Sequence, residues 1–559
     1  MSQEKLCERY FNFDALEYEI DKYESQGIDA FLEDISDDKE LMLICGDFYG
    51  IQKFIFDNLT TEYAAKVLRA KSAFIQIFTD YLVEFICYRF CYRYGRDKTY
   101  KLSSKAGKIE ILSKNLDESI IKDIQKTMDN YFMKYFFGLS GVKLFCCLCN
   151  KDSFENKYTK LREAISNKEE QAKFNKFDLL HKTEKEITFS CDKDLNHQTL
   201  CPMCNMRRIK IDDESCEICN SFVQLGKMLT SCNQGKLDNE KILNLYLFIK
   251  LKECLKDNFR PQLILDEKII SYVHSSDDEE ENNNNNNNNK NKQPTDFKTL
   301  ANYSCNPESG IKALGALKAD VDNLGKSIKK LETFEEFDTF SNNLNNFFSL
   351  YVPKLMEKEF KHTYMVFAGG DDLFLVGAWD EILELARQIR NDFRNFVKEK
   401  LSVSFGICIS RPNTPISYLA QVSEELLKNA KDIDDTKDAI SIFDENTKWH
   451  IYNEVYDKLC EVIGFDRQKK EFNHKLNTKF YYEILEFCKM SQNLNKAGRS
   501  FNPKDALWKS KLNYSFGKYN TQKELEYEKL EKLVECIEKH PKAVKMVFSE
   551  FIYLRREEQ

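Results

Sequence analysis

Two pairs of aspartates, each close to a glycine, are the residues of this sequence best suited to chemistry on a phosphate. Asp371 and Asp372 follow two glycines in the segment Phe-Ala-Gly-Gly-Asp-Asp-Leu-Phe. Asp320 and Asp322 end the segment Leu-Gly-Ala-Leu-Lys-Ala-Asp-Val-Asp. Carboxylates from two such segments can hold two divalent cations, which activate a hydroxyl and neutralise a transferring phosphate. The pattern predicts a nucleotidyltransferase or a cyclase.

The elements that position these acids are a strand and a hairpin. Residues 364–368 and 373–376 are apolar and predict two strands joined by a tight turn, in which Gly369 and Gly370 let a phosphate approach the backbone. A solvated turn would explain this hairpin alone, but the acidic strand end upstream argues against that interpretation. Hard oxygen ligands suit Mg²⁺ or Mn²⁺. We expect Asp320 and Asp371 to ligate the metals, with Asp372 assisting.

Further nucleotide contacts are expected around these acids. The predicted nucleotide-binding residues, besides Gly369 and Gly370, are Val321 (through its carbonyl), Asp322, Asn323, Lys431 and Lys437. The two lysines are suited to phosphate, although an ordinary surface position would explain each of them equally well.

Four cysteines form two Cys-x₂-Cys pairs, at Cys201 and Cys204 and at Cys216 and Cys219. Tetrahedral Zn²⁺ takes four thiolates, and paired turns of this kind supply two each. The spacing predicts a closed, structural zinc site. Four other cysteines could substitute or form a second site, but free thiols are favoured for them: Cys146, Cys147, Cys149 and Cys191.

A basic helical segment lies near the N-terminus. Residues 64–74 place Lys66, Arg69 and Lys71 among apolar positions. An RNA-backbone-binding surface and a solvated helix face explain this pattern equally well.

Composition narrows the class of protein. The chain has 559 residues and a formal net charge of −8, which excludes a globally basic nucleic-acid coat. The first 20 residues lack a signal peptide, and no run of 18 apolar residues predicts a membrane span. Nineteen cysteines without an export signal argue against a disulfide framework and predict a cytoplasmic location. Of seven histidines, none precedes His181, so a histidine–aspartate hydrolase module is not expected at the N-terminus.

The expected fold class is α+β, with two ferredoxin-like palm domains of the nucleotidyl cyclase type. An intervening zinc-containing helical domain and a C-terminal helical bundle complete it. Residues 275–294 hold an acidic cluster and eight consecutive asparagines, and predict a disordered loop. The expected domains are 1–145 (first palm, non-catalytic, with a short N-terminal extension), 146–300 (zinc knuckles and helices), 301–447 (second, catalytic palm) and 448–559 (helical bundle).

The two α/β units show a weak internal repeat. Each has a strand that ends in an acid near a glycine, at Asp47 and at Asp320, followed by helices and a hairpin. The first hairpin, at residues 105–108, lacks the paired acids. The repeat indicates a duplication after which only the second copy kept catalytic carboxylates.

The order of these motifs resembles the large subunit of CRISPR type III effector complexes. Segments 46–56 and 65–74 resemble its first palm, and segments 314–325 and 367–377 resemble its second, catalytic palm. The knuckles lie between the palms as in that family. Segment 508–514 (WKSKLNY) resembles the C-terminal helical domain of the type III-A (Csm) version.

The resemblance implies an RNA-guided antiviral complex with guide RNA, target RNA and other effector subunits as partners. Target RNA would switch on the second palm, which would convert ATP to cyclic oligoadenylates. Asp371 and Asp372 would be the essential acids and Asp320 a metal partner. One ATP would lie on each palm. Many family members begin with a histidine–aspartate DNase domain, which this sequence is expected to lack.

Three other functions stay open. A diguanylate cyclase also has a Gly-Gly-Asp/Glu hairpin, but this one continues Asp-Leu-Phe, and both palms lie in one chain. A variant enzyme could join ATP to a different acceptor. A non-catalytic scaffold would keep the aspartates for structure, although an unpaired acidic cluster is costly without metal.

Overall fold

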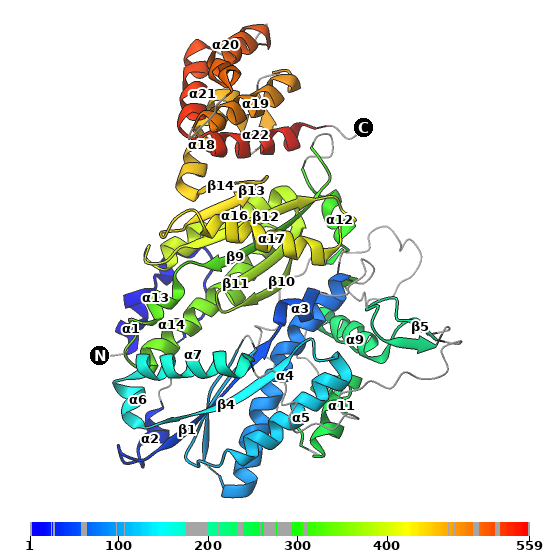
Figure 1. Ribbon diagram of the computed structural model, residues 1–559, viewed down its shortest axis with the longest axis vertical. Helices are drawn as coiled ribbons and strands as arrows, with labels where there is room; N and C mark the ends of the chain where they lie inside the picture. The colour runs from blue at the N-terminus through cyan, green and yellow to red at the C-terminus, as the bar shows by residue number, and fades with distance from the viewer. Residues whose placement is uncertain are drawn as a thin grey trace.

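The computed structural model of the protein has two α/β units and a C-terminal group of helices, which follow one another along its longest axis (Figure 1). It describes residues 3–556 except 24, 26–27, 57–63, 97, 106, 175–197, 211–212, 232–238, 258, 262–274, 277–292, 295, 306–309, 468, 474–475, 496–501 and 520–525. The predicted disordered loop 275–294 therefore lies mostly outside the described residues, as does Cys191.

The first unit is a four-stranded antiparallel sheet in the order β2-β3-β1-β4. Its strands are β1 (Leu41–Tyr49), β2 (Thr99–Lys105), β3 (Lys108–Ser113) and β4 (Gly141–Cys149). Its helices are α3 (Ile51–Phe56), α4 (Ala64–Tyr94), α5 (Ser119–Phe136), α6 (Lys151–Glu155) and α7 (Tyr158–Phe174). The hairpin predicted at residues 105–108 is present, because Lys105 of β2 pairs with Lys108 of β3.

The second unit is a six-stranded sheet in the order β10-β11-β9-β12-β13-β14. Its strands are β9 (Leu314–Val321), β10 (Thr363–Gly369), β11 (Asp372–Ala378), β12 (Val403–Ser410), β13 (Ala439–Ile442) and β14 (Glu445–Lys448). Its helices are α13 (Leu324–Ile328), α14 (Phe334–Asn346), α15 (Val352–Glu359), α16 (Trp379–Phe396) and α17 (Ile416–Lys431). The hairpin lies where the sequence predicts it.

The two sheets share one topology, which agrees with the duplication inferred from the sequence. In each unit a hairpin pairs with the first strand of the unit, and that first strand also pairs with the fourth. By position, β1 therefore corresponds to β9, the hairpin β2–β3 to β10–β11, and β4 to β12. Helices α7 and α17 each follow the fourth strand of their unit.

The two units pack directly on each other. Because side chains alternate along a strand, one face of β9 and β11 contacts α16, while Ala316 and Phe374 on the opposite face join the apolar core that contains α4. The rings of Phe56 in α3 and Phe374 in β11 lie 4.8 Å apart in an edge-to-face contact. One face of the second sheet thus contacts the first unit.

The first residues of the predicted domain 1–145 pack on the second unit. Helix α1 (Gln3–Tyr10) contacts α14, beside which the N-terminus lies in Figure 1. The ring of Phe11 stacks on Phe396 of α16 at 4.8 Å, and the Asn12 amide donates to the Phe396 carbonyl at 2.7 Å.

The predicted domain 146–300 is not separate from the first palm. Its boundary cuts β4, which contains Cys146, Cys147 and Cys149, and α7 packs on that strand. Helix α9 (Glu217–Ser231), which follows the cysteine pairs, lies along α4 (Figure 1). The remaining elements of this part are β5 (Gln198–Leu200), β6 (Arg208–Lys210), α10 (Asn239–Leu243), α11 (Tyr246–Leu255), β7 (Ser275–Ser276), β8 (Gln293–Pro294) and α12 (Phe297–Asn302).

The C-terminal part is a group of helices, as predicted, and it is anchored to the second unit. The helices are α18 (Trp449–Ile463), α19 (Thr478–Asn495), α20 (Trp508–Tyr519), α21 (Tyr527–Lys539) and α22 (Pro541–Arg555), with a small hairpin of β15 (Phe465–Asp466) and β16 (Glu471–Phe472). Arg387 of α16 donates to Glu550 of α22 and to the Tyr452 hydroxyl, at 2.8 and 2.9 Å. No helix in the described part of the chain is long and apolar enough to cross a membrane.

Candidate active site

The predicted acids meet at one end of the second sheet. In the register of β9 and β11, Asp320 lies directly opposite Asp372. Gly369 pairs with Asp372 at the end of the hairpin, which leaves Gly370 and Asp371 as the two turn residues. Gly370 has φ +65°, and a Cβ there would have no neighbour within 4 Å, so the turn needs glycine for its backbone and not for space.

Two hydrogen bonds hold this turn, which we name the acid turn (Gly369–Asp372). The Val321 amide donates to the Asp371 carbonyl at 3.2 Å. The Gly370 amide donates to Oδ1 of Asn345, at the end of α14, at 3.1 Å. Sequence reasoning missed Asn345, because an asparagine in a helix carries no local sign of a partner 25 residues away.

Asp372 lies among charges of both signs. Its Oδ2 is 3.8 Å from Nζ of Lys318, and Lys318 also contacts Glu424 of α17. The side chain of Gln52 in α3 forms a hydrogen bond with Asp372. Burial raises the pKa of Asp372 to about 6, while Lys318 opposes that rise and the Asp371 carboxylate adds to it. Its Oδ1 has no hydrogen-bond partner.

Asp320 is paired with Lys431 at the end of α17. Burial lowers the pKa of Lys431 to about 8, and the charges of Lys437 and Lys318 add to that effect. The lysine is therefore a partly buried cation beside the acid turn, and its contact with a phosphate stays a prediction.

Asp322 is buried and bonded to other parts of the protein, contrary to the predicted nucleotide contact. It is 2% exposed, and its carboxylate accepts hydrogen bonds from Ser402, Ser404 and the Asp438 amide at 2.8–3.0 Å. Burial raises its pKa. Its carboxylate therefore ties β9 to the segments that precede β12 and β13.

The other predicted nucleotide contacts lie near the acid turn. Asn323 has φ +54° and donates its side-chain amide to the Asp435 carbonyl at 3.0 Å, so this side chain joins two loops. Lys437 is half-buried, and its charge lowers the pKa of Lys431. Val321 is buried, and its backbone faces the turn as described above.

The second turn acid, Asp371, has a perturbed pKa. Burial raises its pKa, and the charge of Lys108, at the start of β3, opposes that rise. The first-palm residue Lys105 lies at the boundary with the second palm, because its Nζ is 5.2 Å from the ring of Tyr23, whose hydroxyl donates to Asp338 of α14.

A cavity of about 510 Å³ opens beside Asp372 between the two palms. Apolar side chains of α3 and the sheet line one part of it, including Phe56, Phe367 and Phe374. Gln52, Lys318 and Glu424 provide polar groups in the remainder. Its size and its mixture of aromatic and polar walls fit a nucleoside.

The first palm has a counterpart of this site without either turn acid. Asp47 pairs in register with Lys108, so a lysine takes the position that Asp372 takes in the second palm. Lys173, in the last turn of α7, lies 3.3 Å from Asp47, much as Lys431 of α17 contacts Asp320. The lysine–aspartate pair is thus present twice.

The predicted RNA-binding face on α4 is not an exposed surface. Arg69 is 2% exposed, Lys66 is partly buried with a lowered pKa, and Lys71 reaches the Ile55 carbonyl at 3.4 Å. Because α4 is enclosed by the sheet, α9 and β10, these side chains serve packing between elements, and the prediction is wrong for Arg69.

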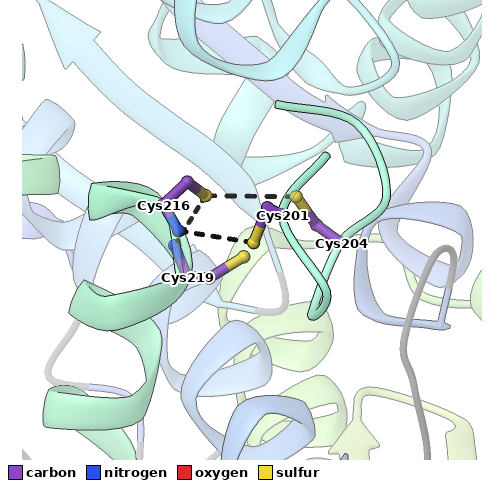
Figure 2. A group of neighbouring side chains, drawn as sticks. All are labelled: Cys201, Cys204, Cys216 and Cys219. Carbon is purple, nitrogen blue, oxygen red and sulfur yellow. Dashed lines mark hydrogen bonds between the residues drawn. The ribbon is translucent and has the colours of Figure 1, made fainter. Parts of the chain in front are cut away.

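Four cysteine thiols converge where the two knuckles meet, as Figure 2 shows. Cys201, Cys204, Cys216 and Cys219 are buried, and their Sγ atoms all lie within 4.8 Å of one another. The Cys204 and Cys216 sulfurs are 3.9 Å apart. A tetrahedral zinc with Zn–S bonds of about 2.3 Å needs sulfurs about 3.8 Å apart, so this donor set fits zinc.

The carboxylates of Asp320, Asp371 and Asp372 fit a divalent cation less completely than the four cysteines fit zinc. Among the described residues, the four cysteines are the only group of three or more potential ligands within ligating distance of one another. Asp320 and Asp372 are cross-strand neighbours, and the unpartnered Oδ1 of Asp372 offers a hard ligand. A cation there would replace Lys431 as the partner of Asp320.

Comparison with known sequences gives the same division of the chain. The sequence model of Cas10/Cmr2, second palm domain, matches residues 313–441, and that of Csm1 subunit domain B matches residues 40–189. A curated relative from Methanocaldococcus jannaschii is 27% identical over 561 residues, covering 83% of this chain and 68% of its own length. A relative from Streptococcus thermophilus is 24% identical, and the match covers 81% of this chain and 60% of the relative's length. Both are described as CRISPR system single-strand-specific deoxyribonuclease Cas10/Csm1 (subtype III-A).

Solved structures show the same fold. The apo Csm1-Csm4 cassette is 20% identical with a TM-score of 0.64, covering 95% of this chain and 71% of the matched chain. The Csm1-Csm4 cassette in complex with cA4 is 19% identical with a TM-score of 0.60, and the match covers 93% of this chain and 70% of the matched chain. The two matched domains, the curated relatives and the solved structures together support a Csm-type large subunit, similar to Cas10/Csm1 of type III CRISPR systems.

Proposed function

We propose that the chain converts ATP to cyclic oligoadenylates as a subunit of an RNA-guided CRISPR complex, with the acid turn of the second palm as its reaction centre. The observation that carries this proposal is the register of Asp320 opposite Asp372, at a glycine turn inside the segment matched by the second palm domain. Solved relatives were captured with ATP, with pppApA and with cA4, which supports ATP as the substrate class.

The reaction would join two nucleotides through a phosphodiester bond. The 3′-hydroxyl oxygen of one nucleotide attacks the α-phosphorus of the next, the bond from that phosphorus to the bridging oxygen breaks, and pyrophosphate leaves. Divalent cations held by Asp320 and Asp371 would lower the pKa of the hydroxyl and neutralise charge on the phosphates. The carboxylate of Asp372, whose Oδ1 is buried without a hydrogen-bond partner, would lie beside the attacking hydroxyl.

The remaining residues of the site would bind and orient the nucleotide. Lys431 would leave Asp320 for the triphosphate, because a cation on Asp320 and the lysine compete for one carboxylate. Asn345 holds the Gly370 amide and so fixes the turn. The cavity beside Asp372 would accept a base against its aromatic wall, with Gln52 offering a side-chain amide.

The partners proposed are guide RNA, target RNA and other effector subunits, of which a Csm4-type subunit is suggested by the solved complexes. Zinc at the four cysteines would be structural. The relatives are described as single-strand-specific deoxyribonucleases. The seven histidines of this sequence begin at His181, and we propose that a histidine–aspartate nuclease is not among its residues.

The test is mass spectrometry of the products that the chain forms with its guide-RNA complex, target RNA, ATP and Mg²⁺. The variant is Asp371→Ala/Asp372→Ala. The matched control is Asp37→Ala/Asp38→Ala, a second adjacent pair that is exposed on the first palm. Cyclic adenylates that vanish in the variant and persist in the control would support the proposal.

Other products would redirect it. A product from GTP alone would favour a diguanylate cyclase, and a product that needs ATP and another metabolite would favour a different acceptor. The absence of product in every condition, with guide RNA still bound, would favour the scaffold.

A further inference from the structure

Another cavity lies at the end of the second sheet that is remote from the acid turn, and we name it the distal cavity. Its volume is about 870 Å³, and its walls come from the segment before β9, the turn after β12 and the end of α22. In the sheet register, Leu314 pairs with Ser410 beside this cavity, whereas Asp320, near the other end of β9, pairs with Asp372. At about 3.4 Å per residue, Leu314 and Asp320 lie about 20 Å apart.

The charged side chains that line the distal cavity all carry the same sign. Among the described residues they are Lys312, Arg411 and Arg556, and no acid is with them. The cavity beside the acid turn differs, because its lysines are matched by Asp372 and Glu424. A chain with a formal net charge of −8 thus gathers three cations around one cavity.

The three cations keep their charge available to a ligand. Arg411 and Arg556 are exposed, and in the part of the chain that the structure describes neither forms an ion pair with a carboxylate. Nζ of Lys312 donates to the Ser304 carbonyl at 2.6 Å. This partner is uncharged, so the hydrogen bond orients the lysine without neutralising it.

The wall that carries these cations is fixed by packing. The Ile311 amide donates to the Tyr553 carbonyl at 3.0 Å, and the Ile311 carbonyl accepts from Nε1 of Trp379 at 3.1 Å. The Tyr553 ring packs edge-to-face on Trp379 and Phe443, with centroids 5.8 and 5.2 Å apart. Burial raises the pKa of Tyr553 and the charge of Asp444 adds to that rise, but Asp444 does not line the cavity.

We propose that the distal cavity binds the phosphate groups of a nucleotide or of a single-stranded RNA, with Arg411 and Arg556 as the principal contacts and Lys312 as the third. A guanidinium binds phosphate through two parallel N–H donors, and an ammonium binds it as a point charge. The side chains of Ser410 and Asn413 add neutral hydrogen-bonding groups to the same wall. The volume is that of a small-molecule site. The inference does not rest on the proposed function, because neither the acid turn nor a divalent cation takes part.

The experiment measures the affinity of the full chain for inorganic tripolyphosphate by calorimetry, in a buffer with a chelator of divalent cations. Without a metal, the carboxylates of the acid turn disfavour an anion there. Arg411→Gln/Arg556→Gln should weaken binding roughly tenfold or more, the effect of two charges with partial solvent screening. Arg411→Lys/Arg556→Lys should restore part of the affinity, because the charge returns without the planar guanidinium.

The matched control is Arg93→Gln/Arg96→Gln at the end of α4. It removes the same charge from exposed arginines in the first unit, of which Arg93 has a 55% exposed side chain. This control should bind tripolyphosphate as the native protein does. Melting temperatures are measured for every variant. If the double glutamine variant melts lower, the two single substitutions decide, and each should weaken binding roughly three- to tenfold.

The outcomes decide the proposal without any measurement of catalysis. Weaker binding in the glutamine variants, absent from the control, supports it. Equal weakening in the control, or no binding by the native protein to tripolyphosphate or to a uridine oligonucleotide, overturns it and leaves the proposed function intact. The oligonucleotide titration also identifies the source of the phosphates: tighter binding than tripolyphosphate indicates a single strand, and weaker binding indicates a free nucleotide.

Discussion

Asp320 and Asp372 lie directly opposite each other on two antiparallel strands, and each is accompanied by a different lysine, Lys431 for the first and Lys318 for the second. Like charges that face each other across a sheet are destabilising. The two lysines offset that repulsion in the cation-free protein, and the pair is therefore a site whose stability depends on what it binds.

The substitution Asp372→Asn should stabilise the cation-free protein at neutral pH. Its folded-state pKa of about 6 lies above the ordinary 3.8, so the folded state holds the proton more tightly. The stability this gives is present below about pH 4 and is lost as the pH rises to about 6. Ionisation of Asp372 lowers the free energy of unfolding at pH 7.5 by at most about 3 kcal/mol. The true loss is smaller, because a quarter of the side chain is exposed to solvent.

The measurement is thermal unfolding at pH 5 and pH 7.5 in metal-depleted buffer. Fluorescence of Trp379 and Trp449, both buried in or beside the second palm, reports on that unit. Asp372→Asn should melt higher than the native protein at pH 7.5, with a smaller difference at pH 5. An equal difference at both pH values would contradict the assignment.

The backbone of the acid turn predicts a graded response at Gly370. Because φ is +65° and an added Cβ would meet no atom within 4 Å, Gly370→Ala should fold with a loss of about 1 kcal/mol from strain alone. Asparagine tolerates this conformation and should cost less than valine, which is β-branched. Denaturant unfolding and product formation from ATP would rank the three variants; valine as the mildest change would refute the argument.

The cysteine cluster predicts one zinc per chain. Cys219→Ser should lower the zinc content measured by plasma mass spectrometry and also lower the melting temperature of the first palm, because α9 packs on α4. Cys91→Ser, a half-buried cysteine outside the cluster, is the control and should keep its zinc. A native protein purified without zinc, yet equally stable after zinc is added, would argue against a structural metal.

The junction to the C-terminal helices predicts a strong effect at Arg387. This guanidinium is 4% exposed and donates to Glu550, which is also buried. Arg387→Met would leave a buried carboxylate without its cation, at a cost of about 3–5 kcal/mol. Adding Glu550→Leu should recover much of that loss.

A double-mutant cycle in urea measures this coupling. The control is Arg394→Met, since Arg394 is 39% exposed and 3.4 Å from Glu399, and it should cost under about 1 kcal/mol. A simple sum of the Arg387 and Glu550 effects would show that the pair does not act as a unit.

The sequence predicted the acid turn because its signals are local. The period of two along β9 and the glycine pair of the hairpin are visible within ten residues. The same period would also have found Lys318, which is two residues before Asp320 and shares its strand face. Gln52, Asn345 and Glu424 come from three separate helices, and only tertiary packing brings them to Asp372.

The interpretation of α4 failed for a physical reason that the sequence contains. Residues 74–88 of this helix are apolar except along one narrow face with Gln76, Asp80 and Glu84, which is typical of a mostly buried helix and not of a solvated one. Lysines and arginines in such a helix use their long stems to reach a boundary, so their positions alone do not indicate an exposed basic face. Likewise, the apolar side chain of Phe11 indicates that this residue is buried, but it does not indicate which palm buries it.

The docking of the N-terminal segment on the second palm sets a delay during synthesis. Phe11 stacks on Phe396, 385 residues later in the chain. At roughly 5–20 residues per second, a ribosome needs about 20–80 s to bring the second ring out after the first. Through that interval the first residues made have no native surface to bind, while the first palm can already fold. The earliest part of the chain to be synthesised is thus among the last to reach its place.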